Sequence, residues 1–161
     1  MKKIYFAALL MAAFSCASFS REFVAAGKTH SSLGDYKIEL ADNPVIINGE
    51  MIKAFVISYQ NSPIDVTVAI MKDKECKKYI VLSDRLSVQY VCNANYFGVE
   101  KLDKSLEIDG YKTSDTEMNR SEYFHQKVLA PGKGDEIENT QLIAAYFPML
   151  LKETKETLAT R

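Results

Sequence analysis

The sequence predicts an α+β domain, with a mainly antiparallel, strand-rich sheet and one kinked C-terminal helix packed on one face. Short β-branched and aromatic runs, separated by turn residues, fill the middle of the chain. Near the C-terminus, apolar residues recur at helical spacing instead. The 161 residues are 47% hydrophobic and 25% charged, with only 7 Gly and 4 Pro, which is typical of one globular domain.

The first twenty residues predict a secretory signal peptide, removed before the domain folds. Lys2 and Lys3 precede an apolar run over 4–14 and a small-residue stretch over 15–20. That run is well short of the roughly 20 residues that a membrane-spanning helix needs. We expect cleavage after Ala17 or Ser20. The basic start indicates bacterial export to the periplasm or the medium.

Lipidation of Cys16 is the main alternative at this end of the chain. Ala13 and Phe14 depart from the Leu-rich, small-residue pattern expected before a lipid-modified cysteine. We therefore expect ordinary cleavage rather than a lipid anchor.

Residues 21–161 are expected to form a single exported domain. Within it we expect a loose leader at 21–35, a strand-rich region at 36–130 and a helical region at 135–158. The signal peptide, residues 1–20, holds two of the 20 basic residues and none of the 21 acidic ones, so the net charge of the mature chain is −3. This charge leaves no basic excess for phosphates, which argues against nucleic-acid binding. We expect no transmembrane segment in the mature chain.

Cys76 and Cys92 are predicted to form a disulfide. They are the two cysteines left after cleavage, and an oxidising compartment favours their pairing. Two β-prone runs between them predict a hairpin with Cys76 opposite Cys92 and Leu82 opposite Leu86. In that register Ile80, Leu82, Leu86 and Val88 share the face of the disulfide.

Further strands are predicted on both sides of this hairpin. Asn48-Gly49 and Asp109-Gly110 favour tight turns between short apolar runs. The run over 52–59 is apolar on both parities, as in a central strand, whereas 64–71 alternates like a strand with one core-facing side. Weaker signals at 36–40 and 122–129 bring the expected total to seven or eight strands.

A C-terminal helix is predicted to begin near Glu136. Asp135 and Glu138 resemble a capping arrangement, and apolar residues then follow at helical spacing. Pro148 is expected to kink or divide the helix, giving one segment to about Phe147 and another to about Leu158. The first segment should cover one side of the sheet.

The sequence contains no complete catalytic or cofactor-binding motif among those that we compared with it, so it gives little support for an enzyme. Gly27-Lys28-Thr29 resembles the end of a phosphate loop, but Glu22 stands where the first glycine is required. No nucleophile elbow, zinc-protease motif or calcium loop is present. We therefore predict no catalytic residue, no metal and no cofactor.

The residues that follow Cys92 are a candidate recognition patch. Tyrosine and asparagine together supply an amphipathic contact surface at small entropic cost. Core packing of a strand end explains the same residues. The binding candidates are Asn93, Asn95, Tyr96, Phe97, Tyr123 and His125.

These observations favour a non-catalytic exported protein that binds another macromolecule, as an interaction module or an inhibitor. The expected partner is another envelope or secreted protein. Two alternatives remain open. One is a carrier of a small ligand or lipid with an apolar cavity, and the other is a hydrolase using His125 with Glu122 or Asp115.

Overall fold

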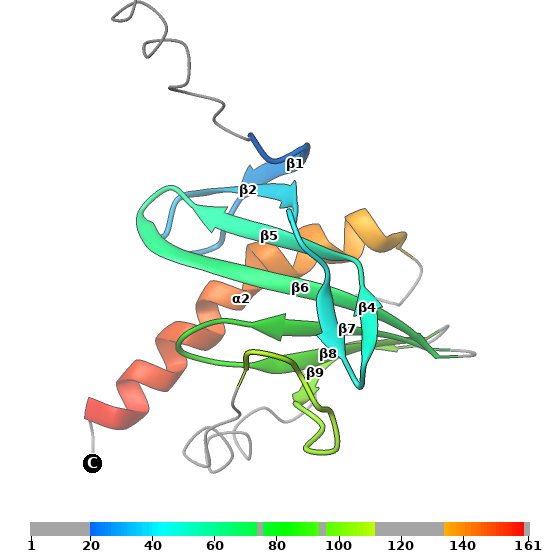
Figure 1. Cartoon of the computed structure of the whole chain (residues 1–161). Coiled ribbons are helices and arrows are strands. Elements are labelled where there is room, and N and C mark those ends of the chain that lie inside the picture. Colours follow the sequence, from blue (N-terminus) through cyan, green and yellow to red (C-terminus); the bar gives the residue numbers. More distant parts are fainter. Residues whose placement is uncertain (1–19, 74–75, 94–95, 112–133, 160–161) are drawn as a thin grey trace, which may run out of the picture.

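The computed structural model describes residues 20–73, 76–93, 96–111 and 134–159. Seven strands form one antiparallel sheet in the order β1-β2-β5-β6-β7-β8-β9, and β3 and β4 form a separate hairpin (Figure 1). The single described helix, α2, spans Glu136–Ala159. The sheet strands are β1 Phe23–Lys28, β2 Asp35–Leu40, β5 Ala54–Tyr59, β6 Ser62–Asp73, β7 Cys76–Leu82, β8 Val88–Asn93 and β9 Tyr96–Lys101.

The predicted α+β class with a strand-rich antiparallel sheet and a C-terminal helix is confirmed. The strand expected over 52–59 corresponds to β5, which lies between β2 and β6 and is covered on both faces. The alternating residues of 64–71 belong to β6, where Val66 and Val68 are completely buried against the helix side. Hydrophobic periodicity therefore identified the central strands correctly.

The helix α2 covers one face of the sheet and forms the larger core cluster with it. Ile143 and Phe147 are fully buried among the side chains of β2 and β5 to β9. The predicted start is confirmed, because the Asp135 carboxylate accepts the Glu138 backbone N–H at 2.8 Å. Pro148 is buried and α2 continues through it as one helix, so of the two expected outcomes, a kink or a division, the division is wrong. Apolar packing on both sides of the proline, by Phe147 and Leu150, holds the two halves on the sheet.

The opposite face of the sheet is covered by the β3–β4 hairpin and by the segment 102–111. The strands β3 (Val45–Ile47) and β4 (Glu50–Ile52) pair across the predicted Asn48-Gly49 turn. Ile47 and Ile108 are buried with Ala69 and Ile80 in a second, smaller core cluster. The sheet is therefore packed on both faces, by a helix on one side and by a hairpin and loop on the other.

Two edge strands were missed by the sequence analysis. Residues 21–35 are not a loose leader, because Phe23–Lys28 form β1 and pair with β2. Tyr96–Lys101 form β9 on the opposite edge. Both segments contain glycine among few β-branched residues, so propensity alone gives a weak strand signal. Pairing with the neighbouring strand supplies the missing stabilisation.

The predicted register of the β7–β8 hairpin is wrong by one residue. Val81 lies opposite Val88, and Lys77 rather than Cys76 lies opposite Cys92. The cause lies in the connecting loop, which extends over 83–87. There the Ser83 hydroxyl accepts the Leu86 backbone N–H at 3.0 Å and donates to the Leu86 carbonyl at 2.7 Å.

This shift separates the two cysteines. Cys92 is buried on the helix side, whereas alternation along β7 gives Cys76 the face of Ile80. Both are free thiols in the structure, so the predicted disulfide is not formed. Burial raises the pKa of the Cys92 thiol. The expected common face is also wrong, because Ile80 and Leu82 lie on the hairpin side while Leu86 and Val88 lie on the helix side.

Candidate functional site

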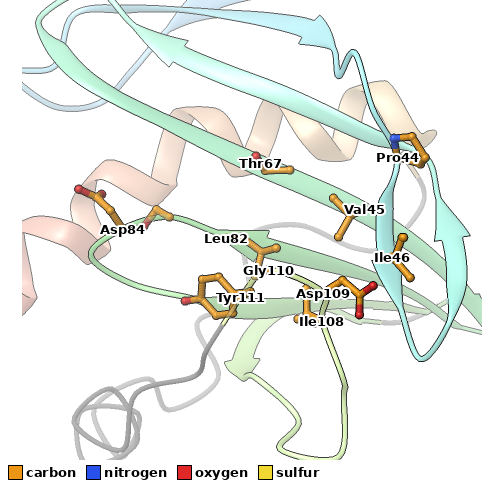
Figure 2. Close-up of a pocket in the computed structure, with 11 residues that line it drawn as sticks. Pro44, Val45, Ile46, Thr67, Leu82, Asp84, Ile108, Asp109, Gly110 and Tyr111 are labelled. Carbon is orange, nitrogen blue, oxygen red and sulfur yellow. The ribbon is translucent and has the colours of Figure 1, made fainter.

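An open, mostly apolar groove of about 480 Å³ lies on the hairpin side of the sheet (Figure 2). We call it the hairpin groove. Its floor comes from Thr67 of β6 and Leu82 of β7, and its walls come from 44–46 and 108–111. Figure 2 shows the side chains of these three parts of the chain around a common space.

The first wall is positioned by the tight β3–β4 turn. Asn48 and Gly49 have φ values of 52° and 78°, as a two-residue turn with positive φ at both positions requires. Asparagine and glycine adopt this conformation at low cost. The turn fixes the strand that carries Val45 and Ile46, and both residues line the groove.

The second wall is tied to the first by backbone hydrogen bonds. Asn48 N–H donates to the Glu107 carbonyl at 2.7 Å, and Asp109 N–H donates to the Ile46 carbonyl at 3.0 Å. The Asn48 side chain also accepts the Glu107 N–H at 2.9 Å. These three bonds hold residues 107–109 beside β3. The two walls are therefore arranged before any ligand arrives, which lowers the entropic cost of binding.

Two local turns shape the segment that carries the second wall. Gly110 has a φ of 74°, and Tyr111 N–H donates to the Ile108 carbonyl at 3.2 Å, so the predicted Asp109-Gly110 turn is confirmed. The Asp103 carboxylate accepts the Ser105 N–H and hydroxyl at 2.9 and 2.8 Å. Those two hydrogen bonds lower the pKa of Asp103.

Polar groups stand mainly at the ends of the hairpin groove. Asp84 and Asp109 are exposed and occupy opposite ends (Figure 2). Tyr111 contacts the Ser87 hydroxyl through its own hydroxyl group. A largely apolar lining with a few fixed polar groups is the usual composition of a binding site.

Within the predicted recognition patch, the structure describes the side chains of Asn93 and Phe97. Phe97 is completely buried and packs against Tyr79 and Tyr90, with ring centroids 5.9 and 5.7 Å away, so it is a core residue. Asn93 is exposed at the end of β8. Tyr96 begins β9, while Asn95 lies outside the described residues.

The remaining predicted site residues also lie outside the described part of the chain. They are Cys16, Tyr123 and His125, together with the hydrolase candidates Glu122 and Asp115. His30 is described: it is exposed, and its ring lies 4.7 Å from that of Tyr146 on α2. Among the described residues, no group of three histidines, cysteines or carboxylates is placed to hold a metal ion. None of the described helices has the length and apolar character required to span a membrane.

No local pattern in the sequence predicts the hairpin groove. The two turn dipeptides are the only local signals in this region, and they do not indicate that the two turns lie side by side. That neighbourhood depends on hydrogen bonds between residues about sixty positions apart in sequence.

The chain matches no protein-family model, no curated protein and no solved structure.

Proposed function

We propose that this chain is an exported, non-catalytic protein that binds another macromolecule through the hairpin groove. The observation that carries this proposal is the groove itself, an apolar depression of about 480 Å³ between two walls joined by backbone hydrogen bonds. The partner would be an envelope or secreted protein that inserts apolar side chains between the walls.

The open shape of the groove favours a protein partner over a carried lipid. Small-molecule sites typically bury about 70–90% of the ligand surface. The hairpin groove is instead open to solvent. Beneath it, the second core cluster fills the space between hairpin and sheet with side chains such as Ile47, Ala69 and Ile80. A groove of this form suits side chains that project from another protein surface.

Mass spectrometry of the protein recovered from its own envelope fraction tests this proposal. Denatured intact mass should show cleavage near residue 20, while added acyl mass would make Cys16 a lipid anchor. The native spectrum should contain a stoichiometric protein partner. A bare monomer or a small-molecule adduct would count against the proposal.

Two substitutions on one hairpin then test the groove as the contact surface. Ile46 lines the groove, whereas Met51 lies on β4, is 78% exposed and does not line it. Ile46→Asp should remove the partner from the native spectrum, and Met51→Asp should retain it. Thermal unfolding of both variants controls for loss of the fold. Retention of the partner by a folded Ile46→Asp variant would contradict the assignment of the groove.

A further inference from the structure

The strand β1 leaves one edge of the sheet without a strand partner among the described residues. It is the terminal strand of the seven and pairs only with β2 (Figure 1). Thr29 N–H donates to the Gly34 carbonyl at 3.3 Å, in the same register that pairs Gly27 with Tyr36 and Ala25 with Ile38. Hydrogen-bonded pairs recur at every second residue of an antiparallel ladder. Gly27 and Ala25 therefore bond to β2.

The same alternation directs the backbone groups of Ala26 and Lys28 away from β2. Their N–H and C=O groups point in the plane of the sheet toward the open edge. Ala26 is exposed, so this edge is accessible in the described structure. It offers donors and acceptors spaced for one more strand.

The edge carries only part of the protection that sheets commonly use. A register irregularity lies between Phe23 and Ala25, and the His30 N–H just beyond the strand donates to the Ala145 carbonyl of α2, but residues 23–27 contain neither a charge nor a proline. Natural edge strands carry charged residues or proline that prevent further pairing. The centre of β1 is Ala25-Ala26-Gly27, with Lys28 only at its end. In contrast, the opposite edge strand β9 ends in Glu100 and Lys101. Small uncharged residues let another backbone approach β1 closely.

A second groove, of about 640 Å³, lies beside this edge on the helix side of the sheet. We call it the helix-start groove. Its lining is half apolar and half charged, with Phe23, Val24, Leu40, Phe55 and Ile137 as the apolar residues and Glu22, Lys53, Lys77, Asp135 and Glu136 as the charged ones. Phe23 and Ile137 are 60% and 42% exposed, and they are two of the three large apolar side chains exposed in the described structure.

Tyr36 brings a polar group to the same edge. A β-carbon on Gly27 would lie 2.6 Å from the Tyr36 Cζ atom, so the tyrosine ring passes directly over Gly27. Because Gly27 belongs to the outermost strand, the Tyr36 hydroxyl reaches toward the position of an added strand. The absence of a side chain at residue 27 is what permits this arrangement.

We propose that the β1 edge binds an extended segment of another protein as an eighth strand, with bulky apolar side chains entering the helix-start groove. Strand addition of this kind draws affinity from main-chain hydrogen bonds and specificity from pockets for alternate side chains. A second copy of this chain is the alternative occupant, because its own β1 carries Phe23 and Val24, and the dimerisation measurement below distinguishes it. This surface is separate from the hairpin groove, so either proposal can fail without the other.

A displayed library of random twelve-residue peptides, selected on the immobilised mature protein, provides the probe. We expect enriched peptides to carry bulky apolar residues at alternate positions. Ala26→Pro removes the outward N–H while leaving the bonds to β2, so it should weaken their binding at least tenfold. The matched control Ala26→Val keeps the N–H and should bind normally. Ile46→Asp in the hairpin groove should also leave peptide affinity unchanged.

If Ala26→Pro does not fold, amide hydrogen exchange of the unmodified protein tests the same contact with the β1 edge. Adding an enriched peptide should slow the exchange of the Ala26 and Lys28 amides, which point to the open edge. The proposal would be overturned if no peptide with alternate apolar residues is enriched, or if the protected amides lie elsewhere. Undiminished peptide affinity in a folded Ala26→Pro variant would overturn it as well. Concentration-dependent dimers that Ala26→Pro abolishes would assign the edge to a second copy instead.

Discussion

The connection between the start of α2 and the sheet depends on Asn139, and replacing this residue tests how the two layers are joined. Asn139 is 1% exposed. Its side-chain amide donates to the Tyr79 hydroxyl at 3.0 Å and to the Gly134 carbonyl at 3.1 Å, and it contacts the Cys92 sulfur at 3.6 Å. Asn139→Ala removes all of these contacts at once and leaves the buried Tyr79 hydroxyl without this donor.

The expected loss of stability follows from those contacts. Each hydrogen bond contributes about 0.5–1.5 kcal/mol net, and a buried polar group left unsatisfied costs about 1–3 kcal/mol. Tyr79 is completely buried, so water cannot readily replace the lost amide. We expect Asn139→Ala to lower the free energy of unfolding by about 2–4 kcal/mol.

Urea unfolding followed by circular dichroism measures this loss, and a double-mutant cycle with Tyr79→Phe identifies its cause. Removing the hydroxyl means that Asn139→Ala no longer leaves it unsatisfied. The second substitution should therefore cost less in the Tyr79→Phe background, with a coupling energy of at least about 0.5 kcal/mol. Strictly additive effects, or a loss below about 0.5 kcal/mol for Asn139→Ala alone, would show that the Asn139–Tyr79 hydrogen bond does not join the two layers.

Three further predictions concern the core. Phe97→Ala should lower stability by about 3–5 kcal/mol in urea unfolding, and a near-neutral effect would restore the interpretation of Phe97 as a surface contact. Burial raises the pKa of Tyr79 to about 12 and also raises those of Tyr59 and Tyr90. The folded state then retains protons that the unfolded state loses, so urea midpoints should be constant below about pH 10 and fall as pH rises toward 12. Iodoacetamide should label both β7 and β8 cysteines in unfolded mature protein without reductant, whereas unlabelled protein lighter by two hydrogens would show a disulfide and contradict the β7–β8 register.

Local signals were sufficient for the elements that are stabilised within a few residues. Asn48-Gly49 adopts its positive φ values because asparagine tolerates them and glycine, which has no side chain, takes them at little cost. Asp135 and Glu138 start the helix because the capping interactions lie within one turn. Such features depend on neighbouring residues, and sequence reasoning predicts them well.

The β7–β8 register shows where local reasoning fails. Two alternating runs can pair in registers that differ by one residue, and such a slip moves every side chain to the other face. The choice here depends on Leu86 entering the core beneath α2 and on Ser83 ordering the loop. Neither contribution can be read from the hairpin sequence alone, because the helix lies about fifty residues further along the chain.

Sequence patterns were sufficient to predict the α+β class, the central strands, two tight turns and the start of the helix, since each depends on periodicity or on contacts within a few residues. Long-range contacts were needed to establish the pairing of the edge strands β1 and β9, the separation of Cys76 from Cys92 and the burial of Phe97. Such contacts also form both grooves, because the walls of each groove come from segments that are distant in sequence. Long-range packing and hydrogen bonding select among arrangements that local propensities leave nearly equal in free energy.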